Sequence, residues 1–230
     1  GSTPVPVPEA LGFCESPDIT GAWFYVMGLI DGRPLYNNEE TLEWVPEEKR
    51  TQLAYSFVDV LADLHAIEPK EVGLENLGKS DSYVGRQLKT WYRSWTSSIE
   101  SANYDDPRAK ELQEFFVEHL PEQKKLSIVH GDYGLHNCLI GEDSFVAAVV
   151  DWEISTLGDP LADLAYAINA FPDSSDIIPI SPEAATAVKG FPERSQLAQR
   201  YGESIPGPPA PQARSDCHCP RRGRQRGDRR

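Results

Sequence analysis

The feature that most constrains the fold is a change in hydrophobic spacing between residues 127 and 154. Upstream of it, apolar residues recur three or four positions apart, which is the spacing of amphipathic helices. Inside it, short runs rich in β-branched and other apolar residues cover positions 126–129, 138–140 and 145–150. Turn-forming residues at 141–144 separate the last two runs. The sequence therefore predicts a small β-hairpin within a mainly helical protein, which is an α+β fold.

Helices are expected on both sides of the hairpin. One spans residues 46–69 and a second begins near Val84, and the pairs Asp106-Pro107 and Asp159-Pro160 each supply an N-cap and a first-turn proline for another. A further helix is expected from Ser181. The residues expected to face inward are Leu53, Phe57, Val60, Leu61 and Leu64, then Val84, Leu88, Trp91, Trp95 and Ile99, then Leu112, Phe115 and Phe116, and finally Leu161, Leu164, Ala165 and Ile168.

The two ends of the chain lack this regular spacing. Residues 1–20 are rich in proline and show little pattern, whereas residues 22–30 are expected to form a strand. A last helix is expected over residues 191–201. Beyond it, residues 203–230 are rich in Pro and Arg without an apolar face, and we expect them to be disordered.

Charge is distributed unevenly along the chain. The whole sequence carries a net charge of −14, but residues 214–230 contain seven Arg against two Asp, a net of +5, which leaves −19 for residues 1–213. An acidic body repels nucleic acid and anionic membranes, so no specific nucleic-acid partner and no membrane partner are expected. The sequence has no apolar run long enough for a membrane helix and no signal-peptide pattern at its start, and its four Cys are scattered. A cytoplasmic location is therefore expected.

The hairpin brings polar residues together. A four-residue turn pairs Ile140 with Phe145, and in that register Asn137 faces Ala148. Continuing the register places Asp151 beside the loop of residues 130–136. Asp132, Asn137 and Asp151 should therefore meet at one end of the hairpin.

Two carboxylates and a carboxamide form an oxygen-rich site. Such donors suit a hard cation such as Mg²⁺, which shares its remaining positions with water and phosphate oxygens. A carboxylate that does not bind the metal can accept a proton from a hydroxyl nucleophile, which is what phosphoryl transfer requires.

The sequence His130-Gly131-Asp132, followed after four residues by Asn137 and then by Asp151-Trp152-Glu153, resembles the aminoglycoside phosphotransferase and choline kinase superfamily. These proteins are small-molecule relatives of protein kinases. The resemblance implies a protein-kinase-like fold and an ATP-dependent phosphotransferase that uses Mg²⁺. It further implies Asp132 as the catalytic base and Asn137 and Asp151 as metal ligands, with His130 holding the loop backbone.

Other stretches narrow the resemblance. Residues 24–27 look like the hinge between the two kinase lobes, which makes Met27 a candidate cofactor-binding residue. Residues 86–95 and 151–165 look most like the branch associated with acyl-CoA dehydrogenases, so hydroxyacyl-CoA is the first expected substrate and an aminoglycoside the second. Asp159 is expected to cap a helix and Asp163 to hydrogen-bond the catalytic loop. Glu153 could bind substrate or only a backbone donor.

The expected domain organisation is based on that resemblance. Residues 1–32 would be a remnant of the N-terminal lobe with the hinge strand, residues 33–202 the helical C-terminal lobe, and residues 203–230 the tail. The Gly-rich loop and the lysine of the N-terminal lobe should precede the hinge, but the first Lys of the sequence is Lys49. We therefore expect a chain truncated at both ends, weak or absent activity, and oligomerisation through the face that truncation exposes.

Two other functions stay open. The first is a metal-dependent hydrolase in which His130, Asp132, His136 and Asp151 surround a metal-activated water. The second is a non-catalytic remnant of the kinase fold. Replacing His136 separates the first from the kinase hypothesis, because only the hydrolase needs it.

Overall fold

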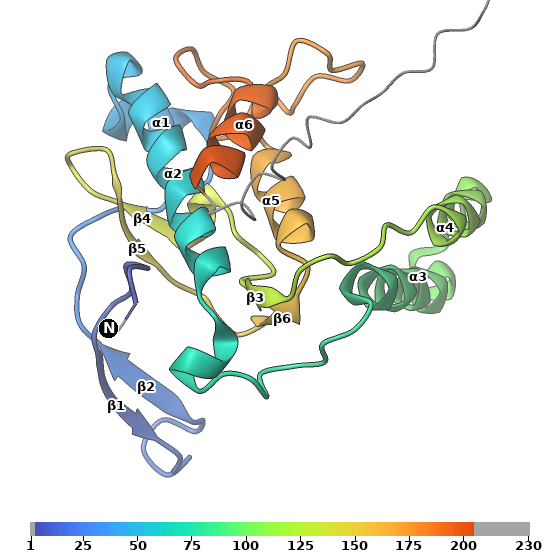
Figure 1. Cartoon of the computed structure of the whole chain (residues 1–230), viewed down its shortest axis with the longest axis horizontal. Helices are drawn as coiled ribbons and strands as arrows, with labels where there is room; N and C mark the ends of the chain where they lie inside the picture. Colours follow the sequence, from blue (N-terminus) through green and yellow to red (C-terminus); the bar gives the residue numbers. More distant parts are fainter. Residues whose placement is uncertain (1–2, 205–230) are drawn as a thin grey trace, which may run out of the picture.

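The computed structural model of the chain describes residues 3–204, and Figure 1 shows a mainly helical body with a few short strands. Residues 205–230 of the tail expected to be disordered lie outside this described range. The α+β class expected from the sequence is confirmed. In chain order the elements are β1 (Ala10–Cys14), β2 (Phe24–Met27), α1 (Asn38–Trp44), η1 (Glu47–Lys49), α2 (Arg50–Ala66), η2 (Pro69–Val72), α3 (Tyr83–Ala102), α4 (Arg108–Glu118), β3 (Ser127–Val129), η3 (Leu135–Asn137), β4 (Cys138–Ile140), β5 (Val146–Val149), β6 (Thr156–Gly158), α5 (Pro160–Ile168) and α6 (Arg194–Ser204).

Helix α2 forms the centre of the core. Its Leu53, Phe57 and Leu61 are fully buried, as the sequence predicts, and α6, β3 and β5 pack around it. The Phe57 ring lies 4.6 Å from that of Tyr133 and 5.8 Å from that of Phe171, measured between centroids. These aromatic contacts join α2 to the loop after β3 and to the segment after α5, so α2 fixes the position of the central loops.

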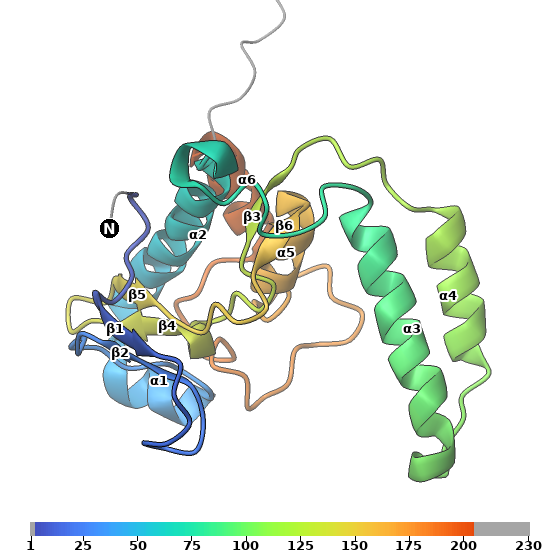
Figure 2. The same ribbon diagram turned by 90° about the horizontal axis from the view of Figure 1, so that it is seen from below.

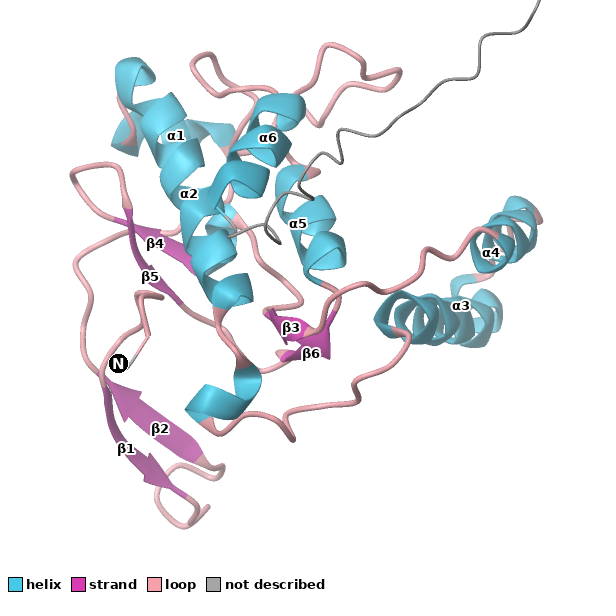
Figure 3. Cartoon of the chain, viewed as in Figure 1, coloured by secondary structure: helices cyan, strands magenta, loops and turns pink. Residues whose placement is uncertain are grey.

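The strands form three separate antiparallel pairs, β1–β2, β3–β6 and β4–β5 (Figure 3). In the third pair, Cys138 faces Val149, Leu139 faces Ala148 and Ile140 faces Val146, with an irregularity after Leu139. The predicted register, with Ile140 opposite Phe145, is wrong. The turn takes one more residue than expected, and Ser144 in it has a left-handed backbone (φ 65°). The irregularity after Leu139 shifts the register by one more position.

The N-terminal segment is more ordered than its sequence suggests. Residues expected to show little pattern contain β1, which pairs with the shorter-than-expected strand β2. Strand β1 carries no hydrophobic alternation because its residues are exposed on both faces. Ahead of it, Val5 is buried in the core and the Pro6 carbonyl accepts a hydrogen bond from the Val149 amide at 2.9 Å. The segment thus joins the edge of the β4–β5 pair.

Helices α3 and α4 form a pair that stands away from the body (Figure 2). The expected inward positions of α4 are exposed, with Leu112 and Phe115 each 53% and Phe116 50% accessible. Trp91 on α3 is also exposed, at 71%. The periodic pattern is real, but α4 packs against α3 rather than against the body, so its apolar face is only partly covered.

Two expectations downstream of the hairpin are wrong. Residues 181–190 form turns instead of a helix. Helix α5 exists, but Leu161 and Ala165 are exposed while Leu164 and Ala167 are buried. The inward face of the helix includes Asp163, which is 2% exposed, and it is therefore centred on Asp163, Leu164 and Ala167 rather than on the apolar residues alone. Among the described residues, no helix has the length and apolarity that crossing a membrane requires.

Candidate active site

Asp132 lies in the loop between β3 and β4, and both of its carboxylate oxygens are engaged. Oδ1 accepts a hydrogen bond from the Tyr166 hydroxyl. Oδ2 lies 3.2 Å from the Asn137 amide nitrogen and 3.4 Å from His136 Nε2. Burial opposes ionisation of this group, but the hydrogen bonds from Tyr166, His136 and Asn137 outweigh it and hold the pKa of Asp132 below its ordinary value.

Asn137 is fixed in one orientation by Asp132. Its side-chain nitrogen donates to the Asp132 carbonyl at 2.9 Å as well as to the carboxylate, and the residue is only 7% exposed. Both amide hydrogens point toward Asp132. The carbonyl oxygen Oδ1 has no donor among the described residues, so it is available to a cation.

Asp151 comes directly after β5 and lies next to the same loop. The preceding residue, Val150, donates its amide to the Asn137 carbonyl at 3.0 Å and accepts from His130 Nε2 at 2.9 Å. Asp151 itself has φ 65°, a left-handed backbone that is uncommon outside glycine and that Asp tolerates better than most residues. Its carboxylate is exposed. The structure therefore brings Asp132 into contact with Asn137 and places Asp151 beside both through the backbone.

His130 is buried, and its two ring nitrogens are both used. Nδ1 accepts from the Asp132 amide at 3.3 Å, so Nε2 carries the proton that is donated to the Val150 carbonyl. The ring thereby links the Asp132 loop to the residue before Asp151. Because neither nitrogen is available, His130 is unsuited to the metal-ligand role that the hydrolase hypothesis gives it.

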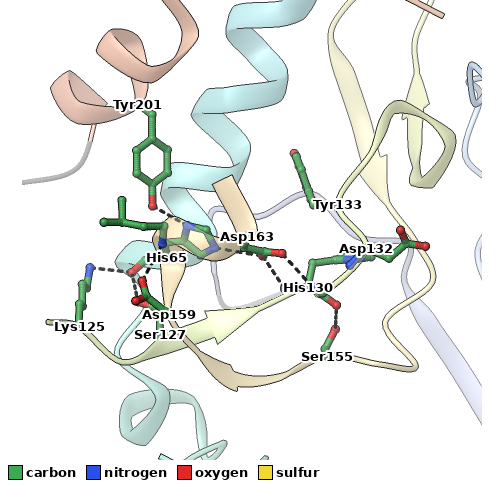
Figure 4. Close-up of polar contacts among 12 residues, drawn as sticks. His65, Lys125, Ser127, His130, Asp132, Tyr133, Ser155, Asp159, Asp163 and Tyr201 are labelled. Atoms are coloured by element: carbon green, nitrogen blue, oxygen red, sulfur yellow. Dashed lines mark hydrogen bonds and ion pairs between the residues drawn. The ribbon is translucent and has the colours of Figure 1, made fainter. Parts of the chain in front are cut away.

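Asp163 holds the same loop from the other side (Figure 4). Its carboxylate accepts from the amides of His130 at 2.7 Å and Gly131 at 3.0 Å. It also accepts from Nε2 of buried His65 at 3.2 Å, and the Tyr201 hydroxyl is 2.6 Å from the other ring nitrogen. This chain of contacts joins α6, α2 and α5 to the backbone beside Asp132. The hydrogen bond expected for Asp163 is present, and its importance for a reaction stays a prediction.

The remaining expected residues have separate positions. Asp159 caps α5 by accepting from the Leu161 amide at 2.9 Å, as predicted. Glu153 is exposed near Asp151. Among the described residues, no group of three or more His, Cys, Asp or Glu side chains gathers into a metal cluster. A metal bound here would therefore need oxygen from the Asn137 amide, the Asp151 carboxylate and a ligand.

A cavity of about 670 Å³ opens beside Asp151. Its walls are mainly apolar, and Met27 of the expected hinge lines it together with Asp151 and Glu153. Mainly apolar walls with a few polar groups are typical of sites that bind small molecules. The wall residues include Val5, Val7, Tyr25, Leu64, Ile67, Val72, Ile128, Val149 and Trp152.

Sequence reasoning did not identify Tyr166. It lies three positions after Asp163 on α5, so the two share a helix face near the Asp132 loop. The spacing of three positions could have predicted that Tyr166 lies near the Asp132 loop, but only once Asp163 is known to point inward. His65 carries no such signal, because no local pattern connects it to Asp163, 98 positions away.

The sequence of this chain is similar to those of several known proteins. The family model described as "Phosphotransferase enzyme family" matches residues 1–202. Acyl-CoA dehydrogenase family member 10 of Mus musculus is 31% identical over 208 residues, which are 89% of this chain and 19% of that protein. Acyl-CoA dehydrogenase family member 11 of Gallus gallus is 35% identical over 164 residues, 70% of this chain and 20% of that protein. This chain spans about a fifth of the length of each of these curated relatives. The sequence identity confirms the expected relation to acyl-CoA dehydrogenase proteins.

Solved structures support the same fold. A candidate aminoglycoside phosphotransferase from Ralstonia eutropha superimposes with a TM-score of 0.70 at 28% identity, covering 88% of this chain and 61% of that one. The aminoglycoside-3'-phosphotransferase of type VIII gives a TM-score of 0.59 at 19% identity, with 89% and 69% covered, and shows the fold alone. With the family match over residues 1–202, these similarities establish that the chain has a kinase-like fold and belongs to the phosphotransferase enzyme family.

Proposed function

We propose that this chain carries the phosphotransfer site of an ATP-dependent kinase that acts on a hydroxyl of a small molecule. The observation that carries the proposal is the arrangement of Asp132, Asn137 and Asp151. The Asp132 carboxylate is oriented by its neighbours, the Asn137 amide oxygen has no donor among the described residues, and the Asp151 carboxylate lines a large cavity. This is the division between a proton acceptor and metal ligands that phosphoryl transfer uses.

In this proposal Asp132 accepts the proton of the acceptor hydroxyl as its oxygen forms a bond to the γ-phosphorus and ADP departs. Asn137 Oδ1 and the Asp151 carboxylate would hold Mg²⁺, and both are the oxygen donors that this ion prefers. A bound Mg²⁺ would neutralise charge on the phosphate oxygens. His130 and Asp163 keep the loop in place, and Met27, which lines the cavity, would contact the base of the nucleotide. Glu153 lines the same cavity and would contact the ligand there.

The proposed acceptor is a hydroxyacyl-CoA, with an aminoglycoside as the second candidate. The first is supported by curated relatives whose names describe acyl-CoA dehydrogenases, and the second by structural neighbours named as aminoglycoside phosphotransferases. One related structure contains streptomycin and ATP, which supports ATP as the donor. A cytoplasmic location is part of the proposal, supported by two free thiols, Cys14 and Cys138, among the described residues.

Nucleotide binding is tested by thermal unfolding with and without Mg²⁺-ATP. Saturating Mg²⁺-ATP should raise the melting temperature of the wild type by at least about 2 °C, because a ligand that binds only the folded state stabilises it. Asp151→Ala should lose this shift. Asp105→Ala, which removes an exposed carboxylate between α3 and α4, should keep it. No shift in any of the three proteins would contradict the proposal and favour a non-catalytic member of the fold.

Chemistry is tested by ADP formation with 3-hydroxybutyryl-CoA or gentamicin as the acceptor. Asp132→Asn should lower the rate at least about 100-fold, the usual contribution of a general base. His136→Ala should change it by less than about fivefold, since this side chain is a partly exposed neighbour of Asp132. Loss of all activity in His136→Ala would instead favour the hydrolase hypothesis.

A further inference from the structure

The Tyr166 hydroxyl donates a hydrogen bond to Asp132 Oδ1, on the residue that we propose as the base. Tyr166 lies on α5 and is 50% exposed. Among the described residues, its hydroxyl has no other hydrogen-bond partner. A half-exposed tyrosine whose polar end is held by a single carboxylate can leave that carboxylate by rotation of its side chain.

The two oxygens of Asp132 are not equivalent. Oδ2 receives Asn137, a nearly buried amide that also holds the Asp132 backbone and cannot leave without disturbing the loop. His136 approaches the same oxygen. Oδ1 is bound only by Tyr166 among the described residues. An incoming hydroxyl that gives its proton to Asp132 therefore approaches Oδ1, the oxygen with a single donor that can leave, and competes with the phenol there.

We propose that the Tyr166 hydroxyl occupies the place of the acceptor hydroxyl on Asp132, and that an acceptor binds by displacing it. This inference rests on the proposed function. The phenol donates one O–H to the carboxylate, as an alcohol or a water molecule would, so it satisfies Asp132 when no substrate is present.

The surrounding fold allows this exchange without a change in the backbone. Helix α5 is fixed at its start by the Asp159 cap and in its first turn by buried Asp163. The Tyr166 side chain projects from this fixed helix on an exposed position. Displacement therefore costs the Tyr166–Asp132 hydrogen bond but not the packing of α5.

The hydrogen bond between Tyr166 and Asp132 also affects water, which is the simplest acceptor of the phosphoryl group. While Tyr166 binds Oδ1, a water molecule that would give its proton to that oxygen and attack ATP has to compete with the phenol. Tyr166 would thus suppress hydrolysis of ATP to ADP and phosphate in the absence of substrate. The same hydrogen bond raises the pKa of Tyr166 to about 12, ahead of the contribution of its partial burial.

The first test measures Mg²⁺-ATP hydrolysis by the whole chain without any other acceptor. Tyr166→Phe should raise the rate about threefold to tenfold, the factor that corresponds to one net hydrogen bond. Tyr104→Phe is the matched control, because Tyr104 is also exposed and its hydroxyl lies 3.5 Å from an aspartate, Asp106, far from the site on the α3–α4 pair. That control should hydrolyse ATP at the wild-type rate. Adding Asp132→Asn to Tyr166→Phe should abolish the gain.

The second test monitors the Tyr166 phenol by carbon-13 NMR of ring-labelled tyrosine, with Tyr166→Phe identifying its signal. The signal should titrate near pH 12 in the wild type and closer to pH 10 in Asp132→Asn. Equal titration in both proteins would contradict the inference whatever the activity.

In the hydrolysis test, equal rates for the wild type and Tyr166→Phe would overturn the inference while leaving the proposed function intact. No hydrolysis in any variant would also overturn the inference, and the proposed function is then decided separately by the Mg²⁺-ATP thermal shift and by ADP formation with an acceptor.

Discussion

The buried polar residues around the Asp132 loop hold it by complementary hydrogen bonds rather than by charge pairing alone. His130 accepts an amide proton at one nitrogen and donates to a carbonyl at the other. Asp163 receives three donors, from His130, Gly131 and His65. Because each buried donor loses water on folding, removal of its acceptor leaves an unpaired group whose cost exceeds the net value of the original hydrogen bond.

Asp163→Ala should therefore lower the free energy of unfolding by about 3–5 kcal/mol, since three buried donors lose their acceptor. Urea denaturation monitored by far-ultraviolet circular dichroism measures this change. Glu43→Ala is the control, because Glu43 pairs with Arg33 at the exposed surface and its loss should cost less than about 1 kcal/mol. Equal losses for the two variants would show that Asp163 is not a structural centre of the loop.

Cys138 makes stability depend on alkaline pH. Its thiol is fully buried, and burial raises its pKa from 9.0 to about 12. Between these values the thiol is ionised in the unfolded chain but not in the folded one, so stability falls as the pH rises above 9. From pH 8 to pH 10 the wild type should lose about 1.4 kcal/mol more than Cys138→Ala does. Parallel pH profiles for the two proteins would contradict this.

At the scale of elements, the sequence predicted best the helices whose apolar residues form one face that the rest of the fold covers. Helix α2 is an example, since Leu53, Phe57, Leu61 and Leu64 are buried as expected and Val60 is partly buried. The inward face of helix α5 was predicted only in part: Leu164 is buried and Ile168 partly buried as expected, but Leu161 and Ala165 are exposed. The helix expected from Ser181 is absent because its capping signal instead closes a turn, in which the Ala184 amide donates to the Ser181 carbonyl at 3.0 Å. A local capping signal identifies one turn of backbone, but whether that turn extends into a helix depends on the packing of later residues.

The turn of the β4–β5 hairpin contains an unfavourable backbone conformation that a substitution can relieve. Ser144 has φ 65°, a conformation that glycine adopts without the clash of a Cβ. Ser144→Gly should raise the free energy of unfolding by about 0.5–1 kcal/mol. The control Ser94→Gly lies within helix α3 and should lower it by about 0.5 kcal/mol. Thermal and urea unfolding of both variants test the contrast, and a loss of stability in Ser144→Gly would refute it.

At the scale of the whole molecule, the candidate site was predictable where its residues flank one hairpin. Asp132, Asn137 and Asp151 come together even though the expected register is wrong by up to two positions, because all three lie at the same end of that hairpin. Tyr166 and His65 could not be placed in this way. Their contacts join positions 34 and 98 residues apart and depend on how α5 packs against α2. Family resemblance identified the reaction class, whereas these partners required the fold.

Packing across the molecule is uneven, and local stability should vary with it. Strands β4 and β5 are largely buried, with Ile140 and Val149 fully covered, whereas Leu11 and Phe13 of β1 are 60% and 62% exposed. An isolated two-stranded sheet is marginally stable. Hydrogen–deuterium exchange should therefore show β1–β2 amides exchanging at least about 100-fold faster than those of β4–β5.

Repeating the exchange measurement at tenfold dilution of the protein provides the control. If the β1–β2 amides are as protected as those of β4–β5 at both concentrations, the prediction is wrong. Protection that disappears on dilution would show that a second copy covers the β1–β2 pair.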